Sequence, residues 1–171
     1  MGNFVRGLIV GAVARAAGVY AYTRLGYFDL RADQNPTAFE DRLGNAAMDE
    51  STERHAPQQK NPLQPGQDTL LAGARLYRDK CSDCHGGPNN PDSDYGRSFY
   101  PRVPQFTKQA PDMPEHENFY IIKHGLRWTA MPSWGGLMTD SEIWQVVTLL
   151  SHFEKLPPDA MAELKKPVGS K

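Results

Sequence analysis

Apolar and polar positions divide the chain into four parts. Residues 4–22 are almost continuously apolar, whereas residues 29–67 are polar, contain several prolines and show no sustained apolar period. From residue 68 onward, apolar residues recur at three- and four-residue steps, the spacing of amphipathic helices, and no pair of segments alternates convincingly like paired strands. The pattern predicts an all-α protein built from an N-terminal apolar helix (1–28), an extended polar connector (29–67), a helical domain (68–157) and a polar C-terminal tail (158–171).

The first helix of the helical domain is expected to run from about Thr69 to the turn at Cys81, with Asp68 or Thr69 as its N-cap. Its apolar face includes Gly73. A glycine inside a helix is less favourable than alanine by about 1 kcal/mol. We therefore expect Gly73 to have a close packing partner.

Two further helices have clear boundary signals. Pro114 and Gly125 favour a helix over residues 115–124, because proline suits the start of a helix and glycine its end. Residues 139–142 form a capping box, and the apolar stripe after it predicts a helix that ends before Pro157-Pro158. The domain over residues 68–157 is thus expected to contain three to four helices.

The connector carries one helix signal of its own. Thr37 and Glu40 form a second capping box, which predicts a short helix over about residues 39–48. The rest of the connector has two interpretations. It is either an extended segment that lies along another surface or a flexible linker.

Two interpretations compete for the N-terminal apolar segment. As a signal peptide, it has Arg6 before a short apolar run and a possible cleavage site at Val19-Tyr20-Ala21. As a retained helix, it is long enough to cross a bilayer. Arg15 interrupts the apolar run in both interpretations, because a charge near the membrane centre is costly unless it reaches the interface or a partner.

A ridge of small residues favours the retained helix. Its members recur at steps of four, three and four residues: Gly7, Gly11, Ala14 and Gly18. Such ridges permit close helix–helix contact in lipid. We expect residues 4–22 to lie in the cell inner membrane with the amino terminus inside, the rest of the chain on the periplasmic side, and Arg15 satisfied by a partner subunit.

The motif Cys81-Ser82-Asp83-Cys84-His85 is the most specific chemical signal in the chain. Two cysteines two residues apart and followed at once by histidine are typical of a c-type haem attachment site. Two thiols on one helical turn can each form a thioether with a porphyrin vinyl group, and His85 can then ligate the iron. The chain has two cysteines in total, so no thiol is left for another purpose. We expect one covalently bound haem c.

Three other interpretations of the motif compete with haem attachment. A structural zinc site needs four ligands, and the remaining histidines form no second pair at zinc-finger spacing. A thioredoxin-like pair needs a βαβ context, whereas residues 86–91 have the composition of a loop. The third interpretation is a structural disulfide between Cys81 and Cys84.

The iron needs a sixth ligand or an open site. Met113 and Met131 each precede a proline, which keeps the backbone extended. Met131 is the better candidate because it lies in the loop between the second and third helices of the domain. His124 is the alternative and would give ligation by two histidines, whereas a Met/His pair gives a higher reduction potential.

Residues 68–156 resemble class I c-type cytochromes. The matching elements are Gly73 to Tyr77, Cys81 to Gly86, Ile122 to Gly125, Ala130-Met131-Pro132, and Ser141 to Leu150. The resemblance implies that the first helix crosses the last one at Gly73 and Trp144. It also implies that Met131 is the distal ligand.

The segment between the haem motif and the second helix is rich in proline and aromatic residues and is expected to reach the haem edge. Tyr100 and Arg102 are its candidate haem contacts, with Arg102 or Arg97 able to pair with a propionate. Trp128 and Trp134 flank Met131, and Trp134 is the stronger candidate for a haem contact.

These features favour an electron-transfer protein, with redox proteins and membrane-embedded subunits of a respiratory or photosynthetic complex as partners. No nucleophile–base pair, carboxylate dyad or phosphate loop indicates substrate chemistry, and a net charge of −1 gives no reason to expect nucleic acid. The alternatives are a haem enzyme or gas sensor with a labile sixth ligand, and a soluble exported electron shuttle.

Overall fold

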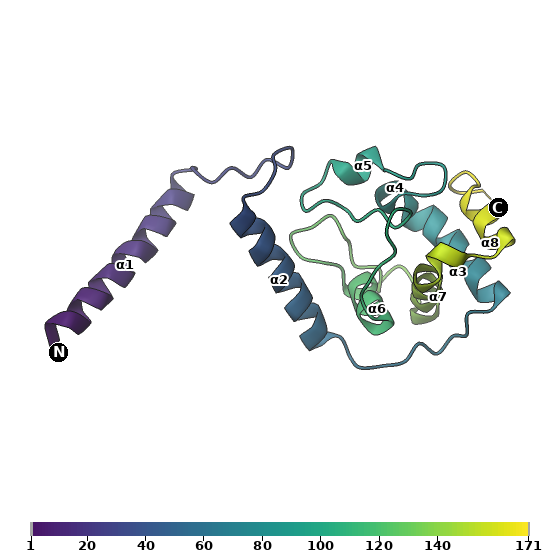
Figure 1. The fold of residues 1–171 in the computed structure, drawn as a ribbon, viewed down its shortest axis with the longest axis horizontal. Helices are drawn as coiled ribbons and strands as arrows, with labels where there is room; N and C mark the ends of the chain where they lie inside the picture. The colour runs from purple at the N-terminus through teal and green to yellow at the C-terminus, as the bar shows by residue number, and fades with distance from the viewer. Residues whose placement is uncertain (1, 171) are drawn as a thin grey trace. The chain divides into compact units, whose positions relative to one another are not determined.

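Helices form the regular structure of this computed structural model, which describes residues 2–170. They are α1 (Gly2–Arg24), α2 (Ala38–His55), α3 (Gln67–Lys80), α4 (Ser82–His85), α5 (Asp94–Arg97), α6 (Glu115–His124), α7 (Asp140–Ser151), a 3₁₀ turn (Phe153–Lys155) and α8 (Pro158–Leu164) (Figure 1). Within the described residues there is no strand, only an isolated bridge between Gly87 and Asn90. The expected all-α fold class is confirmed.

The chain divides into two compact units, one ending at Arg31 and the other beginning at Ala32. Taken by itself, the first unit contains α1, whose 23 residues are all exposed where the structure describes them. At 1.5 Å per residue the helix is about 35 Å long, enough for the roughly 30 Å apolar core of a bilayer. Helix α1 thus has the length and composition of a membrane span, properties that a signal sequence at the N-terminus shares.

The second unit is organised around the contact between α3 and α7. A Cβ atom placed on Gly73 would lie 2.3 Å from the carbonyl oxygen of Gln145 and 3.1 Å from Cβ of Leu149. The expected packing reason for Gly73 is therefore confirmed. Trp144 lies beside this crossing in sequence, but its ring stacks on Phe119 of α6 at 4.2 Å between centroids.

The expected helix boundaries in the domain are correct for α6 and at the start of α7, but not at the start of α3. The capping box between Thr139 and Glu142 is present, and α6 has the expected bounds. The N-cap of α3 is Gly66, so the expectation of Asp68 or Thr69 was wrong. Asp68 instead lies in the first turn, where its negative charge interacts favourably with the positive end of the helix dipole.

The C-terminal segment expected as a polar tail contains α8, which packs on α3. Ala160 and Leu164 are buried there. The buried guanidinium of Arg78 in α3 forms an ion pair with the buried carboxylate of Glu163 in α8. Pro157 is the N-cap of α8, so the Pro-Pro pair that ends the preceding helical stretch also begins a new helix.

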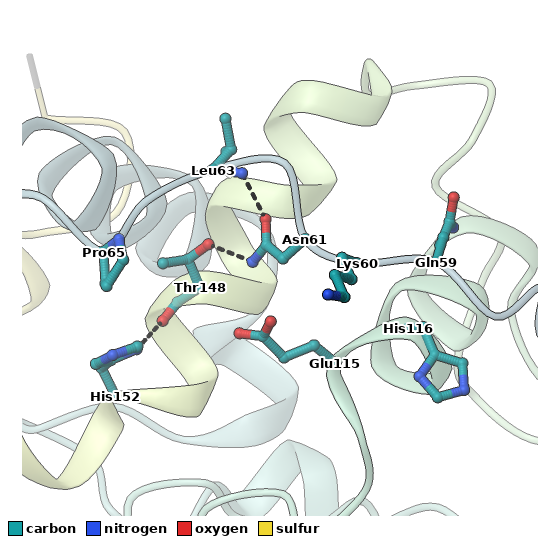
Figure 2. Close-up of a pocket in the computed structure, with 9 residues that line it drawn as sticks. All are labelled: Gln59, Lys60, Asn61, Leu63, Pro65, Glu115, His116, Thr148 and His152. Atoms are coloured by element: carbon teal, nitrogen blue, oxygen red, sulfur yellow. Dashed lines mark hydrogen bonds between the residues drawn. The ribbon is translucent and has the colours of Figure 1, made fainter.

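From Ala32 onward, the connector belongs to the same compact unit as the helical domain and makes contacts with it. Its capping box at Thr37 is present, and α2 extends to His55, beyond the expected end near residue 48. Helix α2 packs on α6 with Thr52 buried. The chain then passes α6 and α7 (Figure 1), where the Asn61 side chain donates to Oγ1 of Thr148 at 2.9 Å. Both residues line a shallow pocket (Figure 2).

Candidate haem site

One turn of backbone carries both thiols and the histidine. Helix α3 ends at Lys80, and the amide of Cys81 still donates to the Tyr77 carbonyl at 2.8 Å. The amides of Cys84 and His85 then both donate to the carbonyl of Cys81, at 3.2 and 2.9 Å. We call residues 81–85 the attachment turn. Its two cysteines are free thiols in this structure, so the disulfide interpretation has no support.

The buried side chain of Tyr77 stabilises the end of the attachment turn by hydrogen bonds to its backbone. Its hydroxyl donates to the carbonyl oxygens of Gly86 at 2.8 Å and His85 at 3.3 Å. Burial raises the pKa of Tyr77 far above its usual range, so the hydroxyl keeps its proton and remains a donor. Gly86 has φ +77°, a left-handed conformation that favours glycine, and it redirects the chain after the turn.

The His85 imidazole is hydrogen-bonded through Nδ1, which leaves Nε2 to bind a metal. Its Nδ1 atom lies 2.9 Å from the Pro104 carbonyl oxygen, and its ring stacks on Phe106 with centroids 4.5 Å apart. Burial lowers the pKa of His85, although the hydrogen bond to Pro104 acts in the opposite direction. The ring is therefore neutral at pH 7, the form that ligates a metal through Nε2.

Both thiols lie in surroundings that favour the protonated form. Burial raises the pKa of Cys81 to about 12, and burial also raises the pKa of Cys84. Across the described residues, no three His, Cys, Asp or Glu side chains are grouped to hold a metal ion. The zinc interpretation therefore lacks a ligand set, whereas two thiols and a neutral imidazole on one turn fit a haem c.

The segment after the turn closes over it through Gly96 of α5. A Cβ atom at Gly96 would lie 2.1 Å from the Cys84 carbonyl oxygen, so only glycine permits this approach. The hydroxyl of Ser93 donates to the Asp83 carbonyl and accepts from the Gly96 amide at 3.0 Å. Helix α5 is therefore fastened directly to the attachment turn.

Met131 lies in a loop that is tied back onto α6. The Leu126 amide donates to the Met131 carbonyl at 3.1 Å, and the Trp134 amide donates to the Ile122 carbonyl at the same distance. Gly125 has φ +69°, and a Cβ atom there would lie 2.8 Å from the Met131 carbonyl oxygen. The Met131 side chain is half-buried against the core, so the loop presents it from a defined backbone.

Comparison with known families adds independent information. Residues 68–150 match the family model described as cytochrome C oxidase, cbb3-type, subunit III. These residues form a c-type cytochrome domain. A c-type cytochrome domain implies haem-based electron transfer.

Three solved chains are also similar to this chain. One of them belongs to the reducing HAO-like protein complex of Kuenenia stuttgartiensis, is 24% identical and has a TM-score of 0.46, with 55% of this chain and 48% of that chain covered. The present chain thus covers about half the length of that solved chain. No curated protein sequence matches.

The alternative ligands occupy different environments in the cytochrome domain. His124 is exposed at the end of α6, with its ring 4.6 Å from that of Tyr120. Met113 is half-buried before α6, where its carbonyl accepts from the Asn118 side chain at 2.9 Å. Met131 is the one of these three that packs against the hydrophobic core.

The expected haem contacts are dispersed around the cytochrome domain. The Arg102 guanidinium donates to backbone carbonyls of its own segment, that of Phe99 at 3.0 Å and that of Arg97. Tyr100 is half-buried, and its pKa is raised by partial desolvation and by nearby carboxylates of α2. Trp134 packs against the core with the Lys80 ammonium 5.6 Å from its ring centroid.

Other predicted residues have surface positions. Arg97 forms ion pairs with Asp92 and Asp94. Trp128 is 89% exposed and has φ +62°. Sequence reasoning missed Gln105 and Phe106, which contact the attachment turn. Their only sequence signal was the density of proline and aromatic residues around them.

Proposed function

We propose that the chain transfers electrons through a single haem c held by thioethers from Cys81 and Cys84, with His85 and Met131 as axial ligands. The haem supplies one-electron redox chemistry when bound. The residues of the chain attach it and orient the imidazole. The bond from Nδ1 of His85 to Pro104 carries this proposal, because it leaves Nε2 as the coordinating atom.

Met131 is proposed as the sixth ligand because it combines three properties. It is a thioether, it packs against the core, and its backbone is fixed to α6. A Met/His pair raises the reduction potential relative to two histidines. Of the other proposed haem contacts, Trp134 is better supported than Tyr100 and Arg102, because it packs on the hydrophobic core, as Met131 does.

We further propose that α1 is a retained anchor in the cell inner membrane and that the cytochrome domain lies on the periplasmic side. Near the carboxyl end of α1, Tyr20, Tyr22 and Tyr27 supply the aromatic side chains that favour a membrane–water interface. Arg6 at the other end favours the cytoplasmic side. The proposed setting is a subunit of a respiratory or photosynthetic electron-transfer complex.

The ligand assignment is tested by Met131→Ala in the mature, haem-loaded protein, with Met113→Ala as the matched control. We expect Met131→Ala to retain the covalent haem mass, lose the weak near-infrared band of Met–Fe(III) ligation and lower the reduction potential. Met113→Ala should keep the band. Survival of the band in Met131→Ala would refute the assignment. Carbon monoxide binding by the reduced wild type at neutral pH would favour a gas-binding haem instead.

The anchor and the complex are tested on protein from native membranes. N-terminal sequencing should find the α1 residues in the mature chain, and native electrophoresis should place the haem signal in a larger assembly. A mature chain that begins at Tyr22, or a haem signal that migrates only as a lone 19.1 kDa species, would count against this part of the proposal.

A further inference from the structure

The Gln105 side chain joins three backbone segments around the attachment turn. Its Nε2 atom donates to the carbonyl oxygens of Cys84 and Val103, both at 2.9 Å. Its Oε1 atom accepts from the Ser93 amide at 2.8 Å. Both functional atoms of this half-buried amide are therefore bonded to backbone, an arrangement that leaves it a single orientation.

The neighbours of Gln105 both contact His85. The Pro104 carbonyl lies 2.9 Å from Nδ1 of His85, and the Phe106 amide donates to the His85 carbonyl at 3.1 Å. The Phe106 ring also stacks on the imidazole at an interplanar angle of 6°. Because Gln105 stands between these two residues, its three hydrogen bonds determine where the Pro104 carbonyl and the Phe106 ring lie.

We propose that Gln105 is a positioning residue that fixes the orientation and basicity of the His85 imidazole. The inference rests on the proposed function, in which His85 ligates the haem iron. A hydrogen bond from Nδ1 to a carbonyl fixes the tautomer of a ligating histidine and raises its basicity. A more basic imidazole stabilises the oxidised iron, so loosening the Pro104 carbonyl shifts the reduction potential to a more positive value.

The test compares Gln105→Met with Gln109→Met in the mature, full-length, haem-loaded protein. Methionine nearly matches glutamine in size but removes both donors and the strong acceptor. Gln109 lies four residues after Gln105 and is exposed. Its backbone amide, which the substitution leaves in place, donates to the Gln105 carbonyl at 3.2 Å. The control therefore repeats the chemical change without touching the attachment turn.

We expect Gln105→Met to have a more positive reduction potential and altered ferric electron paramagnetic resonance g-values, with the Met–Fe(III) band retained. Gln109→Met should match the wild type in all three. A Gln105→Met protein that loses only thermal stability, with an unchanged potential and spectrum, would show that Gln105 is merely structural and would overturn the proposal.

A second measurement needs no variant and decides the question if Gln105→Met fails to mature. In the labelled wild-type holoprotein, the side-chain amide protons of Gln105 should exchange slowly with solvent, because both donors are engaged, while those of Gln109 exchange fast. Fast exchange at Gln105 would refute its role. A wild-type spectrum without imidazole ligation would instead refute the proposed function, and with it the role of Gln105.

Discussion

Replacing Gly73 by alanine tests the helix crossing on which the cytochrome domain is built. The new Cβ atom would lie 2.3 Å from the Gln145 carbonyl oxygen and 3.0 Å from its carbonyl carbon. A carbon and a carbonyl oxygen in favourable contact are about 3.3–3.6 Å apart. The obstructing atoms are backbone, so no side-chain rotation relieves the overlap. Helices α3 and α7 must therefore separate by roughly 1 Å.

Two opposing effects set the size of the change. Alanine is favoured over glycine inside a helix by about 1 kcal/mol. Overpacking a close-packed core costs about 1–3 kcal/mol, and a fixed backbone obstacle places Gly73 at the upper end. The separation also weakens packing around Leu149, which is fully buried. We expect a net loss of about 2 kcal/mol in the free energy of unfolding, or roughly a 10 °C decrease in Tm.

Gly44→Ala is the matched control, because Gly44 is an exposed residue of α2 and a Cβ atom there would meet no neighbouring atom within 4 Å. Guanidinium denaturation of both holoproteins, followed by far-UV circular dichroism and haem absorbance, measures the difference. Gly44→Ala should be neutral or stabilising by up to about 1 kcal/mol. A Gly73→Ala protein at least as stable as the wild type would refute the close crossing.

Two further predictions concern the attachment turn and the C-terminal helix. Gly96→Ala places a Cβ atom 2.1 Å from the Cys84 carbonyl oxygen, so the yield of covalent haem on a denaturing gel should fall. Gly136→Ala, where a Cβ atom meets no atom within 4 Å, should leave the yield unchanged. Equal yields from the two variants would contradict the close contact between α5 and the attachment turn. Glu163→Gln breaks the buried ion pair between α8 and α3 and should lower the free energy of unfolding at pH 7 by about 3 kcal/mol. The hydrogen bond from Lys166 lowers the pKa of Glu163 in the folded state, so its contribution is complete above the unfolded pKa of about 4.3 and disappears as the pH falls through the lower folded value. The difference between Glu163→Gln and wild type in denaturation should therefore shrink below about pH 4, and a difference independent of pH would contradict this linkage.

Structural features that depend on only a few neighbouring residues could be predicted from the sequence. The capping boxes at Thr37 and Thr139 formed as expected, because each needs only a side chain and an amide three residues apart. The attachment turn was also recognisable, since two thiols and an imidazole on one helical turn are placed by local backbone geometry alone. Gly73 was marked for close packing by its unfavourable position within a helix.

Long-range contacts decided the rest. Residues 158–171 were expected to be a polar tail, yet they contain α8, and burial of Ala160 and Leu164 against α3 stabilises this helix. The sequence of the connector gave no sign of its hydrogen bond from Asn61 to Thr148, because the two residues are 87 positions apart.

The same reasoning applies to the candidate site. The motif that we propose attaches the haem could be recognised from the sequence because its chemistry lies in five consecutive residues. Gln105 carried no such signal, because its role arises only when the segment after α5 folds back onto Cys84, 21 residues earlier. The sequence by itself thus determined the motif and the local turn that we propose as the haem attachment site. The tertiary structure decided which backbone carbonyls and rings surround them, since those contacts depend on how distant helices and loops pack.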